Sequence, residues 1–152
     1  LCDRRQRQMC IRDRYCMDKE YYASLAEVRL SRAKELLKEA QYLLEKESFK
    51  SANNRAFYAI EKSIRALLAL ERIETMTHNG NLKQFNYLYI YKGDGTFTPE
   101  DYKMIAKAEQ IRNASDYDDF YVASKSESIQ QVQDAEYIVN KIAQFISNSS
   151  QL

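Results

Sequence analysis

The sequence has 152 residues, enough for one domain with a single core. Its formal net charge of +1 excludes a protein that binds nucleic acid through its overall charge, although a local basic patch stays open. Only three Gly and one Pro are present, which favours helices over a turn-rich β architecture. No apolar run approaches the roughly 20 residues that cross a bilayer, so we expect a cytoplasmic protein without membrane contact.

The N-terminal segment differs in character from the rest of the chain. Residues 4–14, RRQRQMCIRDR, resemble the translated adapter of a common sequencing-library kit. We therefore expect residues 1–16 to be a non-native or disordered extension and Met17 to be the true start; the alternative is a basic arm that binds an anion. Because all the cysteines lie in this segment, we expect no disulfide, no metal site and no cofactor. These cysteines are Cys2, Cys10 and Cys16.

Apolar residues spaced three and four apart predict two long helices joined by a very short link. The first runs from about Asp18 to Lys46, and a Ser24–Glu27 capping box could begin its packed part. The second, residues 48–70, should be central because small alanines along its apolar stripe let other helices approach closely. Its opposite face carries Lys50, Asn54, Arg55, Tyr58, Glu61, Lys62 and Arg65.

Turn residues and a helix-start motif predict two further helices. A turn-like cluster at 77–80 precedes a third helix, roughly 81–91, whose tyrosines also have β propensity. Residues 98–101, Thr-Pro-Glu-Asp, form a strong start signal for a fourth helix that reaches Arg112 or slightly beyond. The Gly-containing stretch 92–95 between them is expected to be a surface loop.

A last helix completes the predicted fold. It should follow a Ser124–Glu127 capping box and reach about Ser147, which leaves residues 148–152 as a frayed tail. Short links make antiparallel neighbours. The fold class is therefore all-α: an up-and-down antiparallel bundle of about five helices over residues 17–147.

Several segments of this bundle, taken in order, resemble a known family. They are AKELLKEAQ, SANNRAFYAIEKSIRALLAL, a THNG turn with Phe85 downstream, and IRNASDY. Over about residues 24–147 this order and spacing resemble the HEPN family of prokaryotic helical bundles, in particular a subgroup with an Asn-Arg-x-Tyr/Phe-Tyr-Ala signature. The resemblance implies a helical bundle that commonly forms a homodimer. It also implies association with nucleotides, RNA or a nucleotidyltransferase partner, in toxin–antitoxin or defence pairs.

Ribonuclease members of that family resemble one another in an Arg-x4-6-His motif. Its His can take the proton from a ribose 2′-hydroxyl, while its Arg stabilises the charge that gathers on the phosphate. The corresponding run here extends from Arg112 to Tyr117, with Tyr at the position of the His. An unperturbed Tyr has a pKa near 10 and is a poor base at pH 7, so this departure argues against nuclease activity.

His78, the single histidine, is a candidate substitute. In a strictly alternating bundle the second and fourth helices run in the same direction, so His78 is expected to approach Arg112, Asp116 and Tyr117. Arg112 would then bind phosphate, and His78 would supply acid–base capacity. The alternatives are that His78 caps a helix and that Arg112 forms an ordinary ion pair with Asp116, meeting Tyr117 only if the helix breaks between them.

Asn54, Arg55, Tyr58 and Asp116 are candidate ligand or partner contacts, with a structural polar network as the alternative. Three functions stay open. The first is a HEPN-like partner of a nucleotidyltransferase that binds nucleotide or RNA. The second is a metal-independent ribonuclease that uses Arg112 with His78 or Tyr117, and the third is a non-catalytic protein-interaction bundle. Because the histidine of the Arg-x4-6-His motif is absent, we favour the nucleotidyltransferase partner over the ribonuclease.

Overall fold

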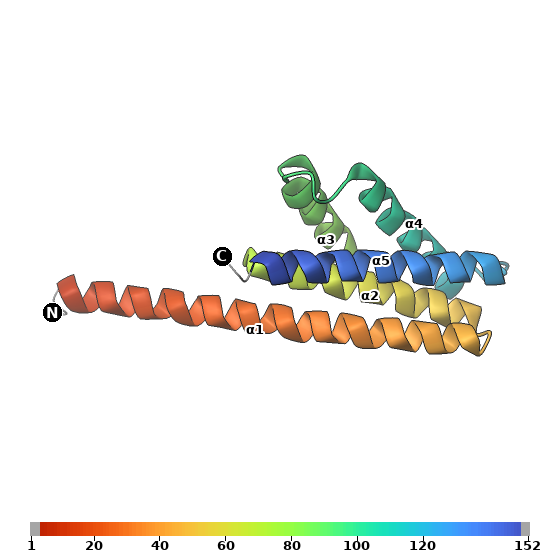
Figure 1. Ribbon diagram of the computed structural model, residues 1–152, viewed down its shortest axis with the longest axis horizontal. Coiled ribbons are helices and arrows are strands. Elements are labelled where there is room, and N and C mark those ends of the chain that lie inside the picture. Colours follow the sequence, from red (N-terminus) through yellow and green to blue (C-terminus); the bar gives the residue numbers. More distant parts are fainter. Residues whose placement is uncertain (1–3, 150–152) are drawn as a thin grey trace.

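The computed structural model describes the backbone of residues 4–149 and the side chains of residues 16–149. Within this part of the chain there are helices and no strand, as the all-α prediction requires. The elements are α1 (Arg4–Glu45), α2 (Phe49–Leu70), α3 (His78–Phe85), the π-helix η1 (Asn86–Tyr91), α4 (Pro99–Tyr117) and α5 (Lys125–Ser149). The long helices α1, α2 and α5 pack side by side, while α3 and α4 rise from them at an angle (Figure 1). The predicted helical bundle is confirmed.

Helix α1 is longer than expected because its backbone is helical from Arg4 rather than from about Asp18. Packing nevertheless begins near the predicted Ser24–Glu27 box: among the described side chains, Ala26 is the first that is buried. Cys16 is an exposed free thiol, whereas the side chains of Cys2 and Cys10 lie outside the described residues. The non-native origin of residues 1–16 stays a prediction, and residues 150–152 of the expected tail are likewise outside the description.

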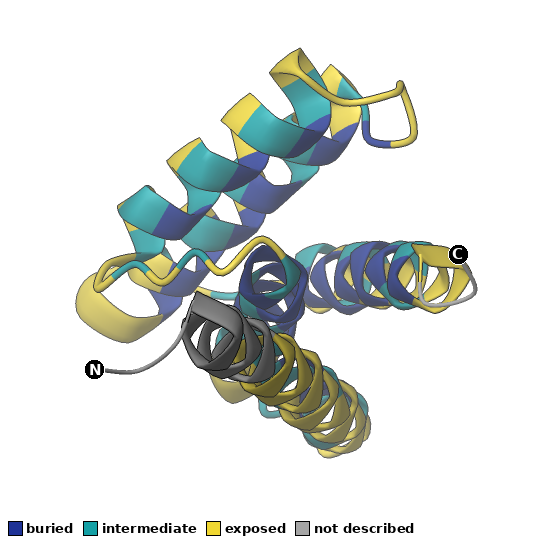
Figure 2. Cartoon of the chain, turned by 90° about the vertical axis from the view of Figure 1, so that its left-hand side faces the viewer, coloured by how far each residue is buried: buried dark blue, intermediate teal, exposed yellow. Residues whose placement is uncertain are grey.

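Helix α2 is central, as predicted. The chain enters it through Glu47, whose φ of 58° lets Ser48 donate its backbone N–H back to Leu43 O at 2.9 Å and reverse direction. Ser48 occupies the N-cap position but makes no side-chain cap. Fully buried alanines and larger apolar side chains line the contacts of α2 with the other helices, and Figure 2 shows this burial where the helices meet. They include Ala52, Ala56, Ala59, Ile60, Ile64, Leu67 and Leu68.

Helix α4 runs opposite to α2, so the expected common direction of these two helices is wrong. Asn53, near the start of α2, donates to Ser115, near the end of α4, at 3.1 Å. Alternation fails because the link 71–77 already carries the chain back. His78, at the start of α3, lies beside Glu61, whereas Tyr89 of η1 reaches Leu67 farther along α2. Instead α3 and η1 lead outward and α4 comes back, so that α5 runs parallel to α2 (Figure 1).

The predicted turn at 77–80 is the start of α3. Thr77 is the N-cap, and its hydroxyl accepts the Gly80 N–H at 3.0 Å, which makes His78 the first helical residue. The helix widens after Phe85 into a π-helix, where the Lys92 N–H reaches Tyr87 O at 2.9 Å. The expected helix over 81–91 therefore exists, but it begins earlier and changes type midway.

The predicted start of α4 is confirmed as a complete capping box. Thr98 and Asp101 exchange hydrogen bonds between side chain and backbone, and Pro99 stands in the first turn. Asp101 also accepts from Lys141 of α5 at 2.8 Å. Burial opposes the ionisation of Asp101, but the Lys141 ammonium and the Thr98 N–H outweigh it and lower its pKa. Through the Asp101–Lys141 contact, the capping box at the start of α4 also binds α5.

Helix α5 begins and ends close to the predicted residues. Glu127 N–H donates to Ser124 Oγ at 3.2 Å, which is half of the predicted capping box before α5. Helix α5 ends at Ser149, two residues beyond the expected Ser147. None of the helices in the described part of the chain combines the length and apolar character that a membrane span needs.

Candidate functional site

Tyr58 on α2 is where the predicted site residues meet. The Arg112 guanidinium carbon lies 5.1 Å from the Tyr58 ring centroid, and its Nη2 donates to the Tyr58 hydroxyl at 2.5 Å. The His78 ring lies 5.9 Å from the same ring. Both residues also contact Phe57, at 5.7 Å for Arg112 and 5.8 Å for His78. His78 and Arg112 are therefore brought together through two shared rings, and among the described contacts none joins them directly.

Arg112 is held on every side, with its side chain only 9% exposed. Its Nη1 donates to Asn113 Oδ1 at 2.9 Å, and Asp116 Oδ2 lies 3.0 Å from its Nε. That ion pair is close, but the buried Nε–H is not aligned for a hydrogen bond and has no other partner in the described chain. The guanidinium has little free surface for a phosphate unless Asp116 or Tyr117 moves.

Tyr117 meets Arg112 although the helix does not break between them, so the expectation that they could meet only at a break is wrong. Helix α4 is continuous through Tyr117, and the Arg112 guanidinium carbon lies 5.4 Å from its ring. The long Arg side chain spans the distance along the helix surface. Tyr117 itself is 73% exposed, so it covers the guanidinium from the solvent side without being part of the core.

The remaining candidates divide into two groups. Asn54 donates to Asp116 Oδ2 at 2.8 Å and so joins the network of Arg112 and Tyr58. Arg55 turns instead to Glu39 of α1 at 3.1 Å. Together with Asp116, both line an open hollow between the start of α2 and the end of α4. The network alternative thus describes Asn54, Tyr58 and Asp116, whereas Arg55 braces α1 against α2.

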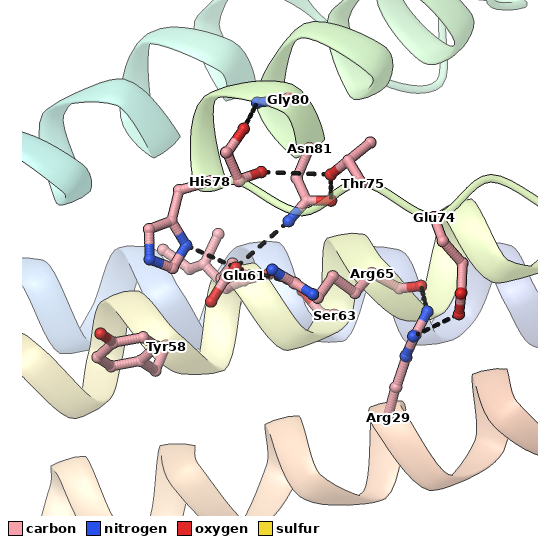
Figure 3. Close-up of polar contacts among 12 residues, drawn as sticks. Arg29, Tyr58, Glu61, Ser63, Arg65, Glu74, Thr75, His78, Gly80 and Asn81 are labelled. Carbon is pink, nitrogen blue, oxygen red and sulfur yellow. Dashed lines mark hydrogen bonds and ion pairs between the residues drawn. The ribbon is translucent and has the colours of Figure 1, made fainter.

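His78 is oriented by a buried carboxylate that the sequence did not single out. Its Nδ1 lies 2.6 Å from Glu61 Oε1, and Glu61 is only 5% exposed (Figure 3). The same oxygen accepts from Arg65 Nε at 2.9 Å and from Asn81 Nδ2 at 3.3 Å. When the Nδ1 proton points at Glu61, the other ring nitrogen, Nε2, is left as a free acceptor. With 37% of its side chain exposed, His78 is accessible to a ligand.

Sequence reasoning missed Glu61 because it lies on the polar face of α2. That face is covered by α3, which crosses over it and supplies both His78 and Asn81 (Figure 3). The available signal was the position of Glu61 directly after Ile60 and three residues before Ile64, both fully or almost fully buried. Charged residues so close to an apolar stripe are seldom buried without partners.

The chemistry of the cluster follows from its parts. It joins an imidazole with a free nitrogen, a carboxylate that fixes the ring, and a guanidinium stacked on the neighbouring tyrosine. A neutral imidazole can accept a proton near pH 7, and a guanidinium stabilises phosphate charge. Among the described residues, no group of three or more His, Cys, Asp or Glu side chains could hold a metal ion.

Fold and site define a helical-bundle protein with a polar cluster on its central helix. Residues 26–147 match the HEPN domain. The chain is also 32% identical, over 112 residues, to the protein named "Putative toxin MJ0605" of Methanocaldococcus jannaschii, across 72% of this chain and 80% of that protein. This chain belongs to the HEPN domain family, which confirms the resemblance inferred from its segments.

Proposed function

We propose that this protein is the toxin-type HEPN component of a toxin–antitoxin or defence pair, and that it acts on RNA or a nucleotide. We propose as its working surface the cluster of Tyr58, Glu61, His78 and Arg112. Family membership and the similarity to a toxin-named protein support the first part. The observation that carries the second is the 2.6 Å contact of His78 with Glu61, since it leaves Nε2 free next to Tyr58.

The proposed partner is a nucleotidyltransferase, and the proposed assembly is a homodimer in the cytoplasm. A transferase that controls the toxin by modifying it needs an accessible hydroxyl close to the working surface. Tyr117 fits this need because it is 73% exposed and lies beside Arg112. Tyr121 fits it less well: burial and its hydrogen bond to Glu127 raise the pKa of its hydroxyl to about 12.

The His78–Glu61 pair favours one second candidate, a metal-independent ribonuclease. In this reaction His78 Nε2 removes the proton of a ribose 2′-hydroxyl, whose oxygen attacks the adjacent phosphorus. The bond from phosphorus to the 5′-oxygen breaks, and that oxygen takes up a proton from water or from the protonated His78, leaving a 2′,3′-cyclic phosphate and a 5′-hydroxyl. Arg112 would stabilise the phosphorane charge after Tyr117 moves aside. His78 is the better base than Tyr117 because a carboxylate fixes its ring.

Induced expression of the full chain in a bacterial host tests this proposal. We expect growth arrest with the natural sequence, and its loss with His78→Ala at an unchanged protein level. The matched control is Asn79→Ala, which alters the next residue of α3 on an outer position. Co-expression of a nucleotidyltransferase from the same operon should restore growth. Normal growth on induction, or arrest that survives His78→Ala, would count against the proposed working surface.

A further inference from the structure

Tyr87 and Tyr91 form an exposed aromatic pair on η1. Their rings lie 6.2 Å apart, centre to centre, with an angle of 14° between their planes. Tyr87 is 46% exposed and Tyr91 is 80% exposed. Two nearly parallel rings that are open to solvent offer π faces to a planar ligand.

The helix that carries this pair is anchored from beneath. Tyr89, between the two in sequence, is buried and stacks on Phe85 at 5.9 Å. Its ring also packs edge-on against Phe145 of α5 at 5.7 Å, and its hydroxyl donates to Leu67 O at 3.2 Å. The outward rings are therefore presented by a fixed element, which lowers the conformational entropy that a ligand must overcome on binding.

Positive charge accompanies the rings. Lys92 Nζ lies 4.6 Å from the Tyr87 ring centroid, and Lys83 is exposed one turn before Tyr87. Within the described residues neither lysine has a carboxylate partner. The nearby Asp94 accepts the Thr96 N–H at 2.9 Å instead. The overall charge of the chain is close to neutral, so this combination of aromatic rings and unpaired lysines is a local feature.

We propose that Lys83, Tyr87, Tyr91 and Lys92 form a contact site for single-stranded RNA. Bases would stack on the two tyrosines, and the lysines would neutralise backbone phosphates. Stacking tolerates any base, so the site would hold a strand without selecting its sequence. The inference rests on the proposed function for its ligand class, RNA, but it requires no catalysis.

The position of this site suits an RNA-acting protein. It lies at the outer end of α3, whose first residue is His78, and α3 spans about 12 Å (Figure 1). A strand held on η1 can therefore extend along α3 toward the working surface. In this arrangement η1 contributes affinity and leaves the chemistry to the cluster around Tyr58.

Fluorescence anisotropy with a labelled 12-nucleotide oligouridylate tests the site in the full chain. The measurement uses a His78→Ala background, in which the RNA is not cut, alongside the natural sequence. We expect the pair Tyr87→Ala and Tyr91→Ala to weaken binding at least tenfold, since both base–aromatic stacks are lost. The pair Tyr87→Phe and Tyr91→Phe should stay within about threefold because the rings remain.

A matched control comes from α1. Tyr42 is 59% exposed and carries Lys46 Nζ 5.5 Å from its ring centroid, but it has no stacked neighbour among the described rings. Tyr42→Ala should leave RNA binding unchanged. Replacing Lys83 and Lys92 by Ala should reduce the salt dependence of binding by about 1.4 in the log–log slope, two phosphates at about 0.7 each.

Photo-crosslinking with 4-thiouridine provides a second measurement, with crosslinked peptides expected within residues 83–92. The proposal is overturned if the double Ala variant binds RNA as the natural sequence does, if the double Phe variant loses as much as the Ala variant, or if the RNA does not bind at all. The first two failures leave the growth-arrest result with His78→Ala intact, so this site can fail while the proposed function stands. Absence of any RNA binding would count against RNA as the target in both proposals.

Discussion

The two sides of Tyr58 differ in how tightly they are held. On one side Arg112 is 9% exposed and contacts Tyr58, Asn113, Asp116 and Tyr117. On the other side His78 is 37% exposed and depends on one buried carboxylate for its orientation. The supporting helices differ as well, because α4 has 19 residues while α3 has 8. Arg112 is therefore fixed by its surroundings, whereas His78 stays accessible to solvent.

Removing the Arg112 side chain should have the largest effect on the stability of the protein. Arg112→Ala leaves Asp116 without its cation and opens space between the rings of Tyr58 and Tyr117, so we expect a loss of about 3 kcal/mol in the free energy of unfolding. Urea denaturation followed by circular dichroism measures it. Arg112→Lys keeps the charge and should lose clearly less. A loss below about 1 kcal/mol in the Ala variant would show that Arg112 is free to serve a ligand.

Replacing the buried carboxylate of Glu61 should have the second-largest effect on stability. Glu61→Gln keeps the shape but weakens three hydrogen bonds from His78, Arg65 and Asn81, and we expect a cost of about 2 kcal/mol. Nitrogen chemical shifts of the imidazole should show that His78 no longer favours one tautomer. Glu100→Gln is the control, since Glu100 is largely exposed, and it should change stability by less than about 0.5 kcal/mol.

A smaller effect is expected where α2 meets the end of α4. Asn53 is fully buried and donates to Ser115, while its own Oδ1 has no partner in the described chain. Asn53→Ala should cost about 1 kcal/mol because it removes the buried hydrogen bond from Asn53 to the Ser115 hydroxyl. Adding Ser115→Ala should restore part of that loss. A double variant that loses the sum of the two single losses would contradict this coupling.

Acid should loosen the contact between the start of α4 and α5. The pKa of Asp101 is lowered in the folded protein, so its contribution to stability is present above the ordinary pKa near 4 and is lost as pH falls through the lowered value. Lys141→Met removes the ammonium and should therefore destabilise the protein at pH 7 more than at pH 2. Urea midpoints at the two pH values measure the difference, and equal losses at both would refute it.

His78→Ala should have the smallest effect on stability and the largest on activity. Its ring is partly exposed, so we expect a change of at most about 1 kcal/mol in the free energy of unfolding. Under the proposed function the same variant abolishes growth arrest. If Arg112→Lys abolished arrest at unchanged stability while His78→Ala did not, the roles of the two sides would be reversed.

Local signals in the sequence identified most of the fold. The apolar stripe and alanines of α2 predicted its central place, and the Thr98–Asp101 box gave the start of α4 to the residue. The direction of α4 was not accessible in this way. It depends on where α3 stops and on the path of the chain after η1, and neither is encoded in the periodicity of α4 itself.

The candidate site likewise has features that the sequence predicted and features that it did not. The spacing of Arg112 and Asp116 within one helix predicted their ion pair, and the pair is present. The burial of Glu61 escaped prediction because α3, and not α2, covers it. His78 came near Arg112 for a reason other than the one expected. The link after α2 carries the chain back so that α3 begins over the middle of α2, rather than two parallel helices ending together.

The place of His78 at the beginning of α3 links its reactivity to helix–coil equilibrium. An eight-residue helix has little intrinsic stability, and the first turn of this one depends on the Thr77 hydroxyl. Whenever that turn frays, the imidazole leaves Glu61 while the bundle stays folded. Warming, or Thr77→Ala, should thus disengage the histidine well below the melting temperature, and faster hydrogen exchange at the Gly80 amide should report it.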